Sequence, residues 1–156
     1  ISLNLIESLL TKYPQHIAGI KDSSGDWNNT QKMLDQKWDD FSIYAGSESF
    51  LLKTMQAGGS GCISATANIN PKNIFDVYEN WQLSDAFKMQ KKIDAVRSVV
   101  QNYPLIPALK CIISHFHEDS TWNILRPPLM TLNHSDSKQL ITELNAINFS
   151  LPKKNH

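Results

Sequence analysis

The first half of the chain alternates between short apolar runs and longer segments of helical periodicity. Three apolar runs are bounded by turn-forming residues and predict buried strands: 17–20, 41–44 and 61–65. Amphipathic spacing and capping residues predict helices around these strands: 2–13, 27–38, 48–57 and from Pro71 onward. Strands that alternate with helices in this way are typical of a parallel sheet covered by helices, so the pattern predicts an α/β fold.

The pattern changes after Trp81, because no further strand is indicated. Apolar spacing, prolines and cap residues predict three helices in this second half: from Ser84 to about Gln101, from Pro107 through Phe116, and from Ser135 to about Ile147. An extended segment is expected at 126–128, since the residue before a proline favours extended backbone. The chain therefore divides into an α/β part, 1–83, and a helical part, 84–156, whose polar tail 152–156 is expected to fray.

Lys21 is the first candidate functional residue, because it follows the first predicted strand and precedes a run of turn and cap residues, 22–26. In parallel α/β sheets and β/α barrels, ligands bind at this edge. An amine held against apolar walls loses solvation, which favours its neutral, nucleophilic form. Lys21 is therefore a candidate for imine formation; the alternative is a surface lysine that only ends the strand.

Composition and charge exclude several classes of protein. The chain has 156 residues, 41% of them apolar and 19% charged, with a formal net charge of zero. This is ordinary for one globular domain and provides no global charge to attract nucleic acid or an anionic membrane, so neither partner is expected. No apolar run approaches the ~20 residues needed to span a bilayer, and the start has no signal-peptide pattern.

Cysteine content and the first residue give two further expectations. Cys62 and Cys111 are too few and too far apart to suggest a disulfide framework or a zinc site, so a reducing, cytoplasmic location is expected. The chain begins with Ile1 rather than methionine, which hints at a preceding N-terminal part. Three predicted strands are also few for a closed architecture, since a β/α barrel needs eight strands and about 250 residues.

Three motifs, in order, carry a resemblance to a known family: Gly19-Ile20-Lys21-Asp22-Ser23-Ser24-Gly25-Asp26, Tyr44-Ala45-Gly46-Ser47-Glu48, and the glycine-rich run 58–68. They resemble the dihydrodipicolinate synthase and N-acetylneuraminate lyase family. Segments 107–110 and 126–129 resemble the family's C-terminal helical part. The resemblance implies the C-terminal part of a (β/α)8 TIM barrel, with strands six to eight and their helices in 1–83, followed by a C-terminal helical extension in 84–156.

Strands one to five of that barrel have no counterpart in this chain. In the family, a Thr-Thr or Ser-Thr pair on an early strand binds the pyruvate carboxylate, and a tyrosine on the fifth strand shuttles protons. Neither motif occurs here, and Tyr44 is no substitute because it belongs to the seventh strand position. The resemblance therefore leaves open whether these residues are active on their own.

The same resemblance implies roles for residues at the strand ends. Lys21 is expected to form a Schiff base with pyruvate or another 2-oxo acid. The Schiff base converts to an enamine that attacks an aldehyde, or the same steps run in reverse and cleave the product. Gly46 is expected where backbone lies close to the substrate; the alternative is a simple turn glycine. Glu48 is expected to contact substrate hydroxyls, as an acidic residue does in sialic-acid lyases; the alternative is a carboxylate that favours the helix dipole.

The loop after the third strand completes the expected substrate site. Ile63 is expected to turn a backbone carbonyl toward pyruvate and its side chain toward the core, and Ser64, Ala65 and Thr66 are expected to line the same rim. No cofactor is expected, because the glycines of 58–61 lack a dinucleotide fingerprint and the lysine of a P-loop. No metal is expected either, because the histidines and carboxylates of 115–119 lie on a helix end far from the barrel motifs in the family layout.

The resemblance therefore implies a lyase or aldolase that uses a lysine Schiff base, acts on a small-molecule 2-oxo acid plus an aldehyde, and assembles as a homotetramer as in the family. The second substrate stays open among aspartate semialdehyde, sialic acid and a sugar-derived oxo acid; the polar run 47–49 favours a hydroxylated one. The alternative function is a truncated half-barrel chain that has a structural role, or none, and no catalytic activity on its own.

Overall fold

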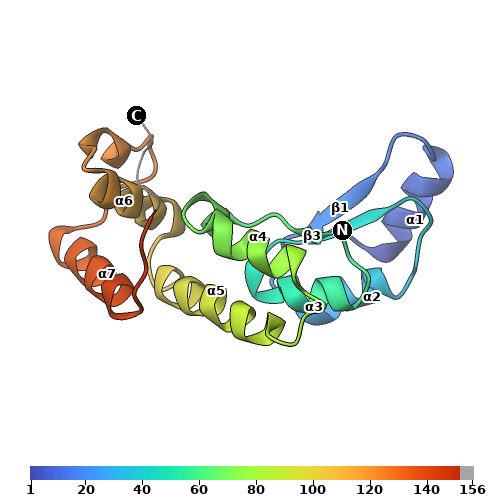
Figure 1. The fold of residues 1–156 in the computed structure, drawn as a ribbon. Coiled ribbons are helices and arrows are strands. Elements are labelled where there is room, and N and C mark those ends of the chain that lie inside the picture. The colour runs from blue at the N-terminus through green and yellow to red at the C-terminus, as the bar shows by residue number, and fades with distance from the viewer. Residues whose placement is uncertain (152–156) are drawn as a thin grey trace.

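The computed structural model describes residues 1–151, which form an α/β structure with a small parallel sheet (Figure 1). The elements, with η for 3₁₀-helices, are α1 (Leu3–Lys12), β1 (Gly19–Asp22), α2 (Trp27–Leu34), β2 (Ser42–Ala45), η1 (Glu48–Phe50), α3 (Leu51–Gln56), β3 (Gly61–Cys62), η2 (Ala65–Asn68), α4 (Pro71–Glu79), α5 (Ala86–Val100), α6 (Leu105–His117), η3 (Ser120–Asn123) and α7 (His134–Ala146). The strands lie in the order β1-β2-β3, and each neighbouring pair is parallel. The predicted α/β class is confirmed.

The two faces of the sheet differ in what covers them. Ile43 and Ala45 of β2 are buried, and Ile43 packs with apolar side chains of α1 and α2. The register pairs Lys21 with Tyr44, so these two side chains share the opposite face, because side chains alternate along a strand. On that face Lys21 is exposed and Tyr44 is only half-buried. The helical core therefore lies on the Ile43 side and leaves Lys21 open to solvent.

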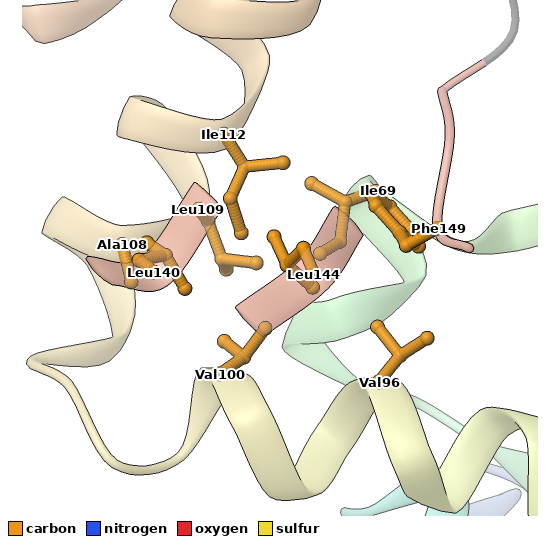
Figure 2. Packing of buried hydrophobic residues seen from close by; sticks show 9 residues of the cluster. All are labelled: Ile69, Val96, Val100, Ala108, Leu109, Ile112, Leu140, Leu144 and Phe149. Atoms are coloured by element: carbon orange, nitrogen blue, oxygen red, sulfur yellow. The ribbon is translucent and has the colours of Figure 1, made fainter. Parts of the chain in front are cut away.

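Buried apolar side chains form three clusters along the length of the molecule. The first joins α1, α2 and β2, the second joins α3, α4 and α5, and the third joins α5, α6, α7 and Ile69 after η2 (Figure 2). Helix α5 supplies Ile93 to the second cluster and Val96 and Val100 to the third, and in Figure 1 it runs from beside α3 toward α7. The predicted boundary between 83 and 84 stays a prediction, but α5 belongs to the cores of both parts.

Several predicted boundaries in the first half are wrong. The helix predicted over 27–38 ends at Leu34. Lys21 lies within β1, one residue before its end, and not after the strand. The predicted helix 48–57 splits into η1 and α3, because Phe50, the last residue of η1, has backbone angles that do not continue into an α-helix (φ −101°, ψ 0°). The predicted strand 61–65 is shorter, since β3 ends at Cys62 and the chain turns into η2. After β3 the hydroxyls of Ser64 and Thr66 both bind the Glu48 carboxylate, and Thr66 does so from within η2.

Caps of the first half follow the sequence closely. The Asp26 carboxylate accepts from the backbone N–H of Asn28 at 2.9 Å, and the Ser47 hydroxyl accepts from the N–H of Ser49 at 3.3 Å. Gly58 follows α3 with a φ of +85°, a left-handed conformation that a glycine adopts readily. Asp26 and Ser47 start their helices shortly after β1 and β2, and Gly58 ends the helical backbone shortly before β3, so these residues fix the lengths of the connecting loops.

Boundaries in the second half also differ from the sequence-based predictions, by no more than two residues. The predicted caps Ser84 and Ser135 are wrong: α5 begins at Ala86 without a side-chain cap bond, and Asn133 caps α7 by accepting from the Asp136 N–H at 2.8 Å. Helix α6 begins at Leu105, two residues before the predicted Pro107. Several neighbouring polar residues could cap the N-terminal end of each helix in the second half, and sequence spacing alone does not select one of them.

The segment 126–128 forms a turn rather than an extended segment, because the Leu129 N–H donates to the Arg126 carbonyl at 3.0 Å. The predicted fraying of 152–156 lies outside the described residues.

Candidate functional site at the carboxyl ends of the strands

Lys21 stands near the carboxyl end of β1, on the sheet face opposite the helical core. An open cavity of about 490 Å³ lies at this strand end, and its lining includes Lys21, Asp22, Ser24, Asn29 and Met33. The expectation that apolar walls surround the amine is not met within the described residues, since Lys21 is exposed. The site therefore presents a reactive group at an open rim, where a ligand can approach it.

Asp22 holds the loop that follows Lys21. Its buried carboxylate accepts from the Thr30 hydroxyl at 2.6 Å, the Ser24 backbone N–H at 3.0 Å and the Ser24 hydroxyl at 3.1 Å. Burial alone would raise the pKa of Asp22, but these hydrogen bonds and one from Asn29 favour the charged form and together lower the pKa below its ordinary value. The position of the loop next to Lys21 is thus set by contacts between near neighbours in the sequence.

Gly46 brings the end of β2 against the same loop. Its backbone N–H donates to the Asp22 carbonyl at 2.7 Å. A Cβ atom at this position would lie 2.5 Å from the Asp22 carbonyl oxygen and 2.9 Å from Ser23 Cα, and both neighbours are backbone atoms that cannot swing away. Only glycine permits this approach, so the residue has a packing role within the chain. That Gly46 also lies close to a substrate stays a prediction.

Glu48 is the most deeply buried charged group of the site, with 1% of its surface exposed. Its carboxylate accepts hydrogen bonds from the hydroxyls of Ser64 and Thr66, both in the loop after β3. Nη1 of Arg97 on α5 lies 3.6 Å from Oε2 of Glu48, and the Arg97 side chain is 21% exposed. This arrangement satisfies the carboxylate from inside the chain. The predicted contact of Glu48 with substrate hydroxyls stays a prediction, and these bonds would have to open to permit it.

Gln90 completes this arrangement from α5. Its Nε2 donates to the backbone carbonyl of Glu48 at 3.0 Å, and its Oε1 accepts from the Leu52 N–H at 3.1 Å. We call Glu48, Ser64, Thr66, Gln90 and Arg97 together the Glu48 cluster. Sequence reasoning missed both α5 residues of the cluster. The sequence pattern that could have indicated them is their spacing: Gln90 and Arg97 are seven positions apart, which places them two turns apart on the face of the helix that also carries apolar core residues.

The loop after β3 carries the other predicted site residues. The Ile63 N–H donates to the Ala45 carbonyl at 2.9 Å, which extends the pairing of β2 and β3 by one bond. The expectation that the Ile63 side chain lies in the core is wrong, because 48% of the residue is exposed. Ser64 binds Glu48, and Ala65 packs against the core of α5, α6 and α7. A substrate role for these three residues stays a prediction.

The parallel sheet brings the predicted residues to one edge. β1 ends just after Lys21, β2 ends just before Gly46, and β3 ends just before Ile63, so all three positions lie at carboxyl ends of neighbouring strands. Within residues 1–151, no three His, Cys, Asp or Glu side chains are grouped so that they could hold a metal ion. In the same range, no helix combines the length and apolar character needed to cross a membrane.

Comparison with known proteins agrees with this geometry. The profile of the Dihydrodipicolinate synthetase family matches residues 1–147. The chain is 32% identical over 147 residues to the 4-hydroxy-tetrahydrodipicolinate synthase of Macrococcus caseolyticus, which covers 88% of this chain and 46% of that protein. The crystal structure of dihydrodipicolinate synthase from Agrobacterium tumefaciens matches with a TM-score of 0.79 and 28% identity, over 94% of this chain and 48% of that one.

A third match concerns a structure with a bound small molecule. A prophage protein of the dihydrodipicolinic acid synthase family from E. coli K12, solved in complex with pyruvate, matches with a TM-score of 0.80 over 94% of this chain and 51% of that one. At 21% identity this likeness shows the fold alone. The chain spans about half the length of the relatives it matches. From the profile match over residues 1–147, the chain belongs to the dihydrodipicolinate synthetase family.

Proposed function

We propose that this chain forms part of a lyase or aldolase in which Lys21 makes a Schiff base with pyruvate or a related 2-oxo acid. The observation that carries the proposal is the place of Lys21: it stands at the carboxyl edge of a parallel sheet, on the face away from the helical core, in a chain of this family. Ligands of β/α barrels bind at that edge. A primary amine at such a rim is the group that carbonyl substrates need for imine formation.

The proposed chemistry uses the amine as a covalent catalyst. The Lys21 amine attacks the keto carbon of the 2-oxo acid, and loss of water gives an imine that is protonated on nitrogen. The imine withdraws electrons, so a proton leaves the adjacent carbon and an enamine forms. The enamine carbon attacks the aldehyde carbon to form the new C–C bond, and hydrolysis of the resulting imine releases the product and the free lysine. The same steps in reverse cleave the bond.

The 2-oxo acid is proposed to be pyruvate or a close relative. The support is the pyruvate bound in the structurally similar E. coli K12 protein, although that likeness extends to the fold only. Aspartate semialdehyde, sialic acid and sugar-derived oxo acids are the candidates for the second reaction partner. The sequence-based preference for a hydroxylated partner depends on Glu48, whose carboxylate is already bonded by Ser64 and Thr66, so it is the weaker half of the proposal.

We also propose that the three strands are strands six to eight of a (β/α)8 barrel, followed by a helical extension. Both β1 and β3 pair on one side only within the described residues, and the Lys21 face of the sheet is open. Unpaired strand edges of this kind invite pairing with further strands. The remaining strands would enclose the amine of Lys21, complete the substrate site and support the homotetramer that the family resemblance implies. The alternative is a chain with no activity of its own.

Reduction with borohydride in the presence of pyruvate tests the Schiff base. The complete gene product is expected to give a stable adduct that peptide mass spectrometry locates on Lys21. Lys21→Arg should abolish the adduct, since arginine keeps the charge but offers no free amine. Lys32→Arg, which changes an exposed lysine of α2 in the same way, should leave it intact. An adduct that survives Lys21→Arg would exclude the mechanism, and trapping by residues 1–156 alone would show that no further strands are needed.

A further inference from the structure

We infer that Glu48 is a positioning residue through which helix α5 sets the loop 63–66 after β3. The inference rests on the proposed function, because it is in that function that this loop borders the 2-oxo acid. Glu48 itself does not touch the reacting atoms in this arrangement. It acts through the two hydroxyl side chains that it holds, Ser64 and Thr66.

The loop side of the cluster is bound at two places. The Ser64 and Thr66 hydroxyls each donate to one oxygen of the Glu48 carboxylate, and the two hydroxyl oxygens lie 2.9 Å from each other. Thr66 is fully buried and Glu48 nearly so, which excludes competing water from the bond between them. Hydrogen bonds to an ionised acceptor are about twice as strong as those between neutral groups. The backbone that leaves β3 is therefore fixed at alternate residues to one carboxylate.

The α5 side binds both ends of Glu48. Arg97 provides the cation beside the carboxylate, with Nη1 3.6 Å from Oε2. Gln90 holds the Glu48 backbone carbonyl and the Leu52 N–H, and its Nε2 also lies 2.9 Å from Oδ1 of Asp94. Because Gln90 and Arg97 are two turns apart on one helix, a shift of α5 along or about its axis would move both contacts together. Glu48 then transmits the shift to the loop after β3.

A purely stabilising role would predict a different arrangement. Buried ion pairs often add little net stability compared with apolar side chains of the same size, whereas they demand a particular geometry. In this molecule α5 already belongs to two apolar cores, to one through Ile93 and to the other through Val96 and Val100. The polar cluster adds a defined geometry to an attachment that apolar packing already provides. It connects the helical extension to the very loop that the proposed function needs.

Cys62 offers a native reporter next to the cluster. It is the last residue of β3, directly before the loop, and it is half-buried. Burial, and then the negative charge of Glu48, raise the pKa of its thiol to about 11. Because the thiolate is the form that reacts with alkylating reagents, Cys62 should react slowly at neutral pH. If the cluster opens, water reaches the thiol and its alkylation accelerates.

Hydrogen exchange on the complete protein tests the positioning role. Arg97→Met is expected to speed exchange of the Ile63, Ile69 and Asn70 amides, which are bonded at the loop, at least tenfold more than exchange of the α2 amides, which reports the loss of global stability alone. Cys62 alkylation by iodoacetamide should rise in parallel. Arg97→Lys, which restores a cation, should recover part of the protection. Lys72→Met, which removes the exposed lysine of the Lys72–Asp76 pair on α4, is the matched control and should change neither readout. If hydrogen exchange accelerated equally in α2 and in the loop, Arg97 would only stabilise the whole fold, and this result would overturn the inference.

Pyruvate trapping separates this inference from the proposed function. In Arg97→Met the pyruvate concentration for half-maximal trapping on Lys21 should rise at least fivefold, while the adduct at saturation stays near the wild-type level. A variant with a mobile loop and an unchanged pyruvate dependence would overturn the positioning role and leave the Schiff base standing. If the wild-type complete protein traps no pyruvate, the proposed function fails and the positioning role for it fails too; the exchange data would then show only a mechanical link between α5 and the loop.

Discussion

The end of β1 and the ends of β2 and β3 are organised in opposite ways. At β1, Lys21 is exposed, and the loop after it is held by Asp22 through partners no more than eight residues away. At β2 and β3, Glu48 is 1% exposed, and its partners come from a loop 16 and 18 residues on and from helix α5. One strand end is open and locally determined, whereas the others are closed and held from far along the chain.

This difference assigns different tasks to two charged groups that the sequence presents alike. Under the proposed function Lys21 forms a covalent bond with a ligand, which needs access, and Lys21 is exposed. A group that must hold loops in register needs burial and several partners, and Glu48 has both. Changes at the closed ends should therefore affect stability first, and changes at Lys21 should affect chemistry first. The following predictions test this contrast from the largest expected effect to the smallest.

Arg97→Met should give the largest loss of stability. It leaves the buried Glu48 carboxylate without its cation, and breaking a buried pair costs 3–5 kcal/mol; partial exposure of Arg97 places the loss near ~3 kcal/mol. Lys72→Met, in the exposed Lys72–Asp76 pair, should cost less than ~0.5 kcal/mol. Urea unfolding of the complete protein, followed by circular dichroism, measures both. Similar losses in the two variants would show that the buried Glu48–Arg97 pair contributes no more to the free energy of unfolding than an exposed ion pair.

Gly46→Ala should cost about 2 kcal/mol, a typical overpacking loss, because its Cβ would press on the backbone of Asp22 and Ser23. Gly25→Ala is the control for conformation without crowding: Gly25 has a φ of +72° and open space around its Cβ position, so about 1 kcal/mol is expected. The same urea titrations apply. A Gly46→Ala variant as stable as the wild type would mean that β2 and the loop beside Lys21 separate easily, and the contact would not order the open rim.

The same contrast explains what could be predicted from the sequence. Asp26 and Ser47 were recognisable as caps, because each binds an N–H two residues away and leaves a local pattern. The order of strands and helices followed from apolar periodicity in the same local way. The pairing of Glu48 with Arg97 has no such pattern, since it depends on how α5 packs after the chain has folded. The exposure of Ile63 could not be predicted from the sequence either, because an apolar residue after a strand is normally expected to be buried.

The family resemblance predicted the roles of the other site residues, but it could not predict their contacts within the chain. It assigned roles to Lys21, Gly46 and Glu48 by position, but position does not state what a side chain contacts. The structure adds that Gly46 is needed for contact with the chain's own backbone and that Glu48 is fully bonded within the chain. Helix ends in the second half were misplaced for a simpler reason. Around 133–136 several polar residues are suited to capping, and only the geometry selects Asn133.

Asp22→Asn should change how stability depends on pH. The pKa of Asp22 is lowered in the folded chain, so its contribution is fully present above the ordinary value of 3.8 and is lost as pH falls through the folded value. The wild type should exceed Asp22→Asn by about 1.5 kcal/mol at pH 6, the scale of hydrogen bonds to a charged group, and by much less near pH 2. Asp39→Asn, at an exposed carboxylate, should show almost no difference at either pH. A constant Asp22 difference across this range would contradict the lowered pKa.

Lys21→Met should have the smallest effect on stability and the most complete effect on chemistry. Lys21 is exposed in this chain, and where the proposed further strands enclose its amine, methionine would replace a charged side chain by an apolar one of similar length, so the free energy of unfolding should fall by less than ~1 kcal/mol. Methionine removes the amine, so no pyruvate adduct can form at this position. Lys32→Met should be equally mild but keep the adduct. If Lys21→Met instead destabilised the complete protein by more than about 1 kcal/mol, the lysine would be part of the packing that closes the barrel, and the division between an open reactive strand end and closed structural ones would not hold.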